Sequence, residues 1–187
     1  MSKETLKNSL RTVRDFPIPG ILFWDVTTLF KDAACLRELE DILYEMYKDK
    51  GITKIVGIES RGFIMGPPSP SGWEPIRHGA QAGQTACRGL EEHYDKEYGK
   101  DTIQIHKDAI TEDDVVLLHD DLLATGGTMC ATHRLVERFH PKQIYVNFVI
   151  ELTSLHGRRQ LPRGVNLRNR PASVRTGTQV PGTHPVP

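Results

Sequence analysis

The chain has 187 residues, a length that suits one domain with a sizeable hydrophobic core. Its 24 Lys and Arg residues balance its 24 Asp and Glu residues, so the formal net charge is zero. This balance argues against a broad binding surface for nucleic acid or an anionic membrane, and any anion site has to be local. Three cysteines without metal-ligand spacing indicate reduced thiols. The polar start and the lack of a membrane-spanning apolar run predict a cytoplasmic protein.

The first part of the chain predicts two helices separated by turn residues. Apolar positions with helical spacing predict a short amphipathic helix over Lys3–Val13. Two prolines and a glycine precede the apolar run Ile21–Phe30, whose adjacent aromatic residues are by themselves more typical of core than of a ligand site. Asp32–Lys50 carries an apolar stripe and is followed by Gly51, which predicts an amphipathic helix with a glycine at its end.

A strand with a polar loop follows. Lys54–Ile58 predicts a buried strand that ends in the sequence ESRGF. In this loop Arg61 offers the forked guanidinium that phosphates favour, Ser60 offers a hydroxyl, and Gly62 leaves the backbone accessible. The loop therefore predicts an anion site, although ESRG alone is a weak motif.

The middle of the chain is less regular. Pro67–Gly89 has no apolar periodicity and is rich in Pro, Gly, Ser, Ala and Gln, which predicts a flexible segment. Glu91–Gly99 is polar and aromatic and predicts a mobile flap or β-turn. Thr102–His106 alternates strictly and predicts a half-exposed strand.

The most informative stretch is Val115–Thr128, VVLLHDDLLATGGT. Its apolar start predicts a strand buried on both faces of a parallel sheet, and the loop after it lies at the carboxyl end, where open α/β sheets bind ligands. Glycines permit close approach, threonines offer hydroxyls, and the predicted helix Met129–Phe139 presents free N–H groups, so the loop predicts a phosphate site. Asp120 and Asp121 would repel a phosphate but accept hydrogen bonds from hydroxyls. A phosphorylated ribose fits both parts of the stretch, because its phosphate suits the loop and its hydroxyls suit the two carboxylates. The loop residues are Ala124, Thr125, Gly126, Gly127 and Thr128.

Three further features complete the chain. His119 stands where a strand residue should be apolar, and we interpret it as a tolerated strand-end histidine rather than a catalyst. Ile144–Ile150 predicts the next buried strand. From about Leu167 the chain has four prolines and little to bury, which predicts a disordered or draped tail.

The order of strand, two acids, small loop and helix resembles the phosphoribosyl-pyrophosphate signature of the type I phosphoribosyltransferases. The letters DDLLATGGT are similar to those of members that act on adenine. The resemblance covers roughly residues 1–66 and 91–160 and implies a single domain over residues 1–166. It implies an α/β fold with a mostly parallel sheet of about five strands flanked by helices, an N-terminal hood and a flexible flap.

The resemblance also implies a reaction, namely transfer of 5-phosphoribose from phosphoribosyl pyrophosphate to adenine, giving AMP and pyrophosphate. It implies Mg²⁺ held mainly by the substrate, with no residue assigned as a direct ligand, and a homodimer. Loop 124–128 is expected to hold the 5-phosphate, and Asp120 and Asp121 the ribose. The other expected contacts are Ser60, Arg61, Gly62 and Arg77 for pyrophosphate, Leu22, Phe23 and Trp24 for adenine, Tyr94 and Tyr98 in the flap, and Glu97 as an aid to proton movement.

The chain departs from the family pattern in three places. The family often has arginine where this chain has Trp24. In 67–89 the family has a short helix, a core strand and a basic loop, of which only Pro75–Arg77 survives as a fragment. We interpret part of this segment as read out of frame, because bases that spell Lys-Leu-Pro in one frame can spell Gln84–Cys87 in another; a truly divergent loop is the alternative. A second frame disturbance is our interpretation of 167–187.

Two alternative functions stay open on the sequence. A regulatory protein could keep the phosphoribose site without catalysis, but such proteins add a DNA-binding module and none is visible here. An impaired enzyme is the other, because 67–89 lacks the family's basic loop and His78 stands about where a lysine is expected.

Overall fold

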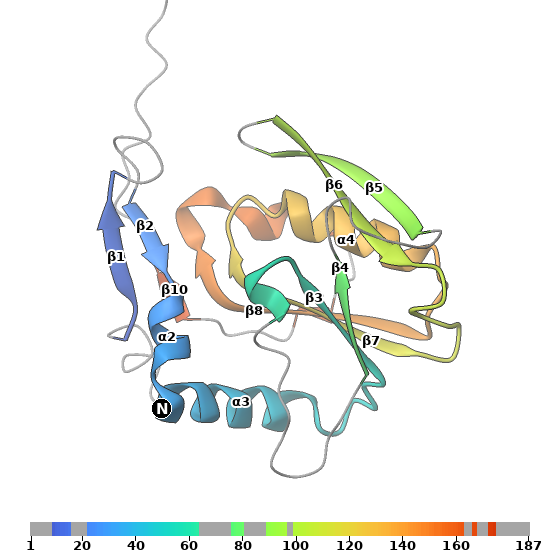
Figure 1. The fold of residues 1–187 in the computed structure, drawn as a ribbon, viewed down its shortest axis with the longest axis horizontal. Coiled ribbons are helices and arrows are strands. Elements are labelled where there is room, and N and C mark those ends of the chain that lie inside the picture. Colours follow the sequence, from blue (N-terminus) through green and yellow to red (C-terminus); the bar gives the residue numbers. More distant parts are fainter. Residues whose placement is uncertain are drawn as a thin grey trace, which may run out of the picture.

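The computed structural model describes residues 9–15, 22–63, 76–80, 89–96, 99–162, 166–167 and 172–174. Its centre is a parallel sheet with the strand order β10-β8-β7-β3-β4, and β9 also pairs with β8 (Figure 1). An all-parallel sheet needs both faces covered, which explains the continuous apolar runs in its central strands. The strands are β3 (Lys54–Ile58), β4 (Ile76–Ala80), β7 (Val115–Leu123), β8 (Gln143–Leu152), β9 (Asn166–Leu167) and β10 (Ala172–Val174).

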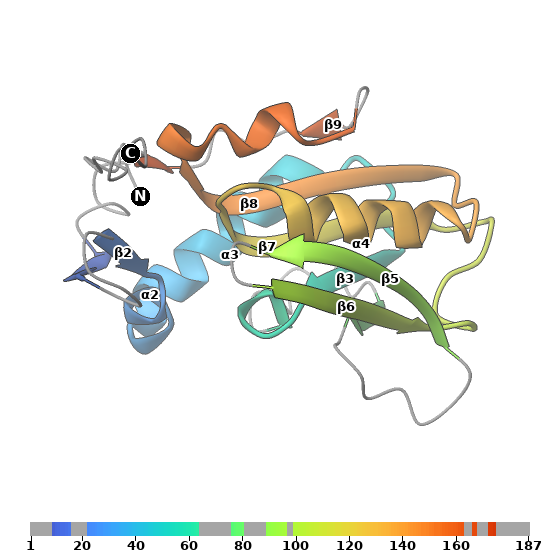
Figure 2. The ribbon, with the colours of Figure 1, turned by 90° about the horizontal axis from the view of Figure 1, so that it is seen from above.

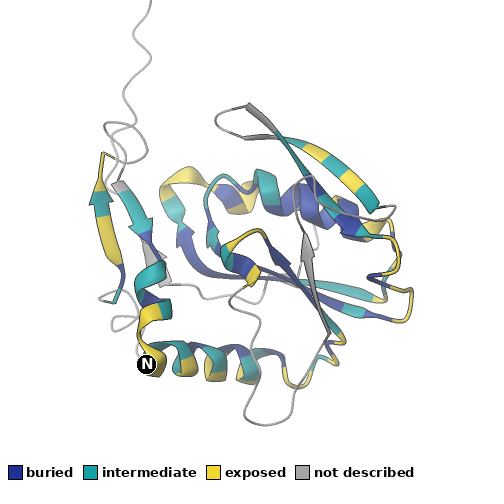
Figure 3. Cartoon of the chain, in the orientation of Figure 1, coloured by how far each residue is buried: buried dark blue, intermediate teal, exposed yellow. Residues whose placement is uncertain are grey.

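Helices cover the two faces of this sheet. Helix α3 (Ala33–Tyr47) packs on one face, where Tyr47 meets Ile55 and Leu117 in one buried cluster. Helix α4 (Gly127–Glu137) packs on the other, where Leu135 belongs to the largest cluster. Buried residues accordingly concentrate in the central strands and on α4 (Figure 3).

The α3 helix starts where the sequence predicts. The Asp32 side chain accepts hydrogen bonds from the backbone N–H groups of Ala34 at 2.9 Å and Cys35 at 3.1 Å, which is an N-cap. The helix ends at Tyr47, and Gly51 follows with φ of +64°. Among the described residues, no helix is long and apolar enough to cross a membrane.

Two antiparallel hairpins flank the sheet. Strands β1 (Arg11–Arg14) and β2 (Leu22–Asp25) pair at one end of the molecule, beside the short helix α2 (Thr27–Lys31), where the hood is expected (Figure 1). Strands β5 (Gly89–Lys96) and β6 (Gly99–His106) form the second hairpin, which lies along α4 in both views and corresponds to the expected flap (Figures 1 and 2).

The structure corrects some of the predicted elements. Arg11–Arg14 is a strand rather than the end of a helix, because pairing with β2 overrides the local periodicity; residues 1–8 lie outside the described residues. Ile76–Ala80, within the segment predicted as flexible, is a strand paired with β3. In the predicted tail, Ala172–Val174 pairs with β8. The sheet has six strands among the described residues rather than about five.

Candidate active site

The predicted phosphate loop connects β7 to α4 in a conformation that needs glycine. Gly126 has φ of +91°, and a Cβ there would lie 2.7 Å from the carbonyl oxygen of Gly157. Gly157 belongs to the short 3₁₀ helix Gly157–Arg159, and a Cβ on it would lie 2.2 Å from the Ala124 carbonyl oxygen. The loop therefore packs directly on this second segment, and side chains at either glycine would push the two apart.

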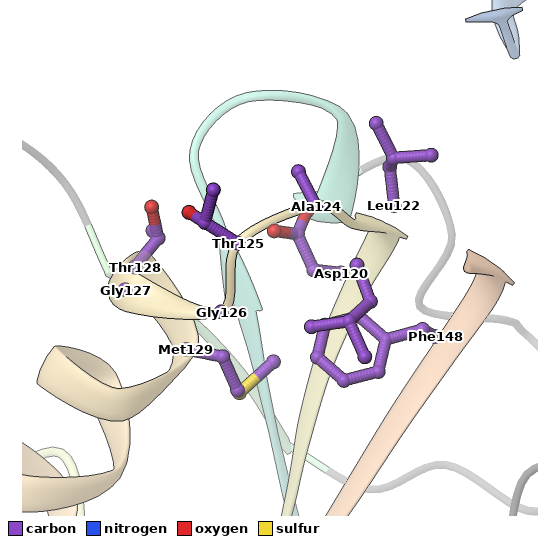
Figure 4. Close-up of a pocket in the computed structure, with 10 residues that line it drawn as sticks. Asp120, Leu122, Ala124, Thr125, Gly126, Gly127, Thr128, Met129 and Phe148 are labelled. Atoms are coloured by element: carbon purple, nitrogen blue, oxygen red, sulfur yellow. The ribbon is translucent and has the colours of Figure 1, made fainter. Parts of the chain in front are cut away.

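The loop encloses a cavity of about 140 Å³ at the carboxyl end of β7 (Figure 4). One wall is the loop and the first turn of α4, whose leading N–H groups have no partners inside the helix. The opposite wall includes Asp120, whose side chain lies beside Phe148 in the close-up (Figure 4). The lining residues are Asp120, Leu122, Leu123, Ala124, Thr125, Gly126, Gly127, Thr128, Met129 and Phe148.

The two signature carboxylates have different surroundings. Asp120 lines the cavity, and its Oδ1 accepts a hydrogen bond from the Asp121 backbone N–H at 2.9 Å. Burial, and then the neighbouring Asp121 charge, raise the pKa of Asp120 well above its ordinary value. The Asp121 side chain is only 3% exposed and forms an ion pair with Arg61 Nε. A side-chain hydrogen bond between the two carboxyl groups also contributes to the raised pKa of Asp120, so the two side chains lie close together although their other partners differ.

The ESRG loop folds back onto the end of β7. It contains a cis peptide bond between Glu59 and Ser60 and continues as the 3₁₀ turn Arg61–Phe63. A Cβ at Gly62 would lie 2.8 Å from the His119 carbonyl oxygen and 3.5 Å from Asp120 Oδ1. The structure thus brings together the two strand-end loops that the sequence singles out, because β3 and β7 are neighbouring parallel strands.

The expected adenine residues lie on β2. Phe23 is half-buried, and Leu22 pairs with Arg14 of β1 in the strand register. Trp24 packs against the same core cluster as Leu122, which also lines the cavity. The Trp24 indole N–H is buried and has no hydrogen-bond partner among the described residues.

Asp25, directly after these residues, anchors the end of the hood hairpin. Its Oδ1 accepts hydrogen bonds from the Thr27 hydroxyl at 2.6 Å and the Thr27 backbone N–H at 2.9 Å. Arg11 forms an ion pair with its Oδ2. The Thr27 hydroxyl and then Arg11 lower the pKa of Asp25 to about 2.

The remaining predicted residues are only partly described. Glu97 and Tyr98, which follow β5 and precede β6 in the sequence, lie outside the described residues. Arg77 is on β4, paired with Ile55 of β3. Tyr94 packs against the main core cluster, and its hydroxyl donates to Asp101 at 3.5 Å.

The β5–β6 hairpin is attached to α4 by two polar contacts. Arg134 Nε donates to Glu92 Oε1 at 2.7 Å, and an Arg138 N–H donates to the Glu91 carbonyl oxygen at 2.8 Å. The flap and the phosphate loop therefore share one helix as their support.

Sequence reasoning missed several residues that line or brace the cavity. The sequence predicts Phe148 as part of the buried strand Ile144–Ile150. The strand register pairs Phe148 with Asp120, so its place at the cavity follows only once β7 and β8 are known to be neighbours. Met129 was predicted as a helix residue only. Gly157 has no local signal, because its role depends on contact with a loop 31 residues earlier at Gly126.

Comparisons with known proteins point to one family. A family model described as the phosphoribosyl transferase domain matches residues 25–162. The chain is 66% identical over 162 residues to adenine phosphoribosyltransferase of Bacteroides fragilis, across 84% of this chain and 89% of that protein. The crystal structure of adenine phosphoribosyltransferase from Rhodothermus marinus matches with a TM-score of 0.79 and 46% identity, across 87% of this chain and 93% of that chain.

A second solved structure carries ligands. It is the Saccharomyces cerevisiae adenine phosphoribosyltransferase complexed with adenine and D-2,5-dideoxy-2,5-imino-altritol 1,6-bisphosphate. It matches with a TM-score of 0.79 and 34% identity, across 87% of this chain and 96% of that chain. The α/β fold with a parallel central sheet is thus shared at high coverage. The chain therefore belongs to the phosphoribosyl transferase family and, within it, to the adenine phosphoribosyltransferases.

Proposed function

We propose that this protein transfers the 5-phosphoribosyl group of phosphoribosyl pyrophosphate to adenine, giving AMP and pyrophosphate in purine salvage. The observation that carries the proposal is the cavity in which Asp120 faces the glycine loop at the start of α4. The yeast relative, complexed with adenine and a cyclic imino-sugar bisphosphate, supports the same pair of ligands here.

The loop provides the site for the 5-phosphate. Backbone N–H groups at the start of α4 and the hydroxyls of Thr125 and Thr128 are donors, and the helix dipole favours an anion. Gly126 and its packing on Gly157 hold these donors in place before the substrate binds. Such preorganised donors position the sugar without further reorganisation.

Asp120 and Asp121 hold the ribose end of the site. In the reaction a nitrogen of adenine forms a bond to ribose C1 while the bond from C1 to the pyrophosphate oxygen breaks, and positive charge develops on the sugar. The cavity places the Asp120 carboxylate beside the loop, where it can accept hydrogen bonds from ribose hydroxyls and stabilise that charge. The proton that leaves the base is assigned to Glu97, on the family resemblance.

Arg61 is assigned to the leaving pyrophosphate, with Ser60, Gly62 and Arg77. The Arg61 side chain is 40% exposed although Nε is bound to Asp121, so its guanidinium is both anchored and accessible to a ligand. A guanidinium suits a pyrophosphate because it donates in a fixed fork.

Magnesium is proposed as a cofactor carried largely by the substrate. The described residues contain no group of three His, Cys, Asp or Glu side chains that could hold a metal ion. The carboxylate of Asp120 suits a hard cation that takes its other ligands from pyrophosphate and ribose oxygens. When bound, magnesium neutralises charge on the leaving group.

We also propose a cytoplasmic homodimer. Cys35 and Cys130 are free thiols, which supports a reducing compartment. The dimer rests on the family resemblance, with interface residues near the Arg61 loop. Sedimentation at micromolar concentration tests it, and a monomer contradicts it.

The experiment that tests the function is AMP formation from adenine and phosphoribosyl pyrophosphate in the presence of Mg²⁺. AMP formation that depends on both substrates supports the proposal. Binding of phosphoribosyl pyrophosphate without AMP formation favours the alternatives of a regulatory binder or an impaired enzyme.

A further inference from the structure

A chain of buried polar side chains runs across the sheet beside the signature carboxylates. His119 of β7 and Asn147 of β8 are paired in the strand register, and His119 Nδ1 is 2.9 Å from Asn147 Oδ1. Asn147 Nδ2 donates to the Tyr47 hydroxyl at 3.2 Å, and that hydroxyl donates to the Val146 carbonyl oxygen at 3.4 Å. His119 is 1% exposed, and Asn147 and Tyr47 are 0% exposed. Strands buried in a parallel sheet are normally apolar, so this chain is a departure from the pattern.

The direction of these bonds favours one tautomer of the histidine. The Tyr47 hydroxyl gives its proton to Val146, so its oxygen accepts from Asn147 Nδ2 and Asn147 turns its own oxygen toward the imidazole. His119 Nδ1 therefore carries the proton that Asn147 accepts. Nε2 has no hydrogen-bond partner among the described residues, and burial keeps the ring neutral by lowering the pKa of His119 to about 4.

The anchored histidine lies under the loop that carries Arg61. Gly57 of β3 is the residue paired with His119, and a Cβ on Gly57 would lie 2.5 Å from the Gly62 carbonyl oxygen. A Cβ on Gly62 would in turn lie 2.8 Å from the His119 carbonyl oxygen. The Arg61 loop therefore packs directly against the main chain of His119. Asp121, two residues farther along β7, lies on the same side of the strand as His119 and binds Arg61.

We propose that His119 is a positioning residue. Its hydrogen bond to Asn147 fixes β7 against β8 where β7 supports the Arg61 loop, and so sets the Arg61–Asp121 pair for the pyrophosphate end of the substrate. The buried Nε2 of His119 has no hydrogen-bond partner among the described residues, so the histidine lowers the stability relative to an apolar residue at this position. The inference rests on the proposed function, because it assigns the pyrophosphate to Arg61.

The deciding variant replaces His119 and Asn147 together by valine, so that neither polar side chain is left buried without the other. The expected result is a folded protein whose Kd for phosphoribosyl pyrophosphate, measured by calorimetry, is raised about tenfold because the Arg61 loop has shifted. The KM for adenine stays unchanged. The conservative variant His119→Asn keeps a donor for Asn147, and its Kd stays within about threefold of the wild-type value. Tyr47→Phe removes only the hydroxyl that orients Asn147 and is a milder second test, expected to raise the Kd about threefold.

Thr53→Val is the matched control. It removes a hydrogen bond to Asp114, 2.7 Å long, at the opposite end of β7, and it should lower the Tm without changing the Kd. The proposal is overturned if the double valine variant binds phosphoribosyl pyrophosphate as tightly as wild type, or if the Thr53 variant loses as much affinity. A wild-type protein that binds no phosphoribosyl pyrophosphate overturns the proposed function itself, which separates the two failures.

Discussion

Asp120 and Asp121 are adjacent in the sequence and their side chains interact with each other, but the two carboxylates have different further partners. Asp120 faces the cavity beneath the glycine loop, whereas Asp121 is buried against Arg61. The two residues therefore have separable effects on stability and on activity.

Asp120→Asn is expected to lower kcat/KM by about a hundredfold, because an amide cannot stabilise developing positive charge as a carboxylate does. Its effect on stability has the opposite sign. The pKa of Asp120 is raised in the folded state, so the folded protein binds more protons and loses stability as the pH rises above the ordinary value of 3.8 toward the raised one. The asparagine variant has no carboxyl group to titrate, so it does not lose this stability as the pH rises. Urea unfolding at pH 4 and pH 8 should show a gain over wild type only at the higher pH.

Asp121→Asn should instead destabilise the protein, because it leaves the Arg61 guanidinium without its carboxylate partner. Since Arg61 is 40% exposed, the expected loss is modest, about 1–2 kcal/mol at pH 7. The double asparagine variant should be nearly inactive. Equal stability of the two single variants at pH 8, or unchanged turnover of the double variant, contradicts these roles.

Asp25→Asn is expected to weaken the hood hairpin in a pH-dependent way. The folded-state pKa of Asp25 is lowered from 3.8 to about 2, so its contribution is present above pH 3.8 and is lost as the pH falls toward 2. The variant should lose about 1 kcal/mol of unfolding free energy at pH 7, and the difference from wild type should shrink on acidification. Asp113→Asn, at a side chain 91% exposed, is the control and should change stability by less than about 0.5 kcal/mol. A loss that is constant from pH 7 to pH 3 would argue against the ionised Asp25 contacts.

Gly126→Ala should impair the phosphate loop. The position has φ of +91°, and the new methyl group would lie 2.7 Å from a backbone oxygen of Gly157. We expect a loss of about 2 kcal/mol in stability and at least tenfold weaker binding of phosphoribosyl pyrophosphate. Gly51→Ala is the matched control, because φ there is +64° and no atom lies within 4 Å of the added carbon. It should cost about 1 kcal/mol and leave binding unchanged. Equal affinities of the two variants would mean that the loop tolerates a side chain.

The sequence predicted those parts of the site that are continuous along the chain. Lys54–Ile58 matches its strand, and the glycine loop follows β7 as expected. His119 was predicted at a strand end, yet β7 continues to Leu123 because the long partner β8 pairs with it to that point. His119 is therefore an interior residue of the strand. The same extension places the two acids within β7.

Contacts between segments that are distant in the sequence could not be predicted from local sequence patterns. The Arg61–Asp121 ion pair joins residues 60 positions apart, and nothing in either motif indicates the other. The composition around Ile76–Ala80 predicted a flexible segment, but pairing with β3 makes these residues a strand. Whether 67–89 reflects a change of reading frame stays a prediction. Sequencing the encoding DNA tests it, and one undisturbed frame without the family's usual codons contradicts it.

The choice of base tests the central claim most directly. Adenine has no 6-oxo group, so its site needs an acceptor for the 6-amino group and a donor to a ring nitrogen, which backbone groups beside Leu22 and Phe23 can provide. A hypoxanthine site needs a donor for the 6-oxo group, commonly a lysine, and Ile21–Phe30 contains none.

The measurement is kcat/KM for the two bases with the same enzyme and saturating phosphoribosyl pyrophosphate. Because a mismatched base leaves buried polar groups unpaired, adenine should be preferred by ~10⁴-fold or more. Comparable turnover of adenine and hypoxanthine would contradict the assignment of the base while leaving the phosphoribose site intact.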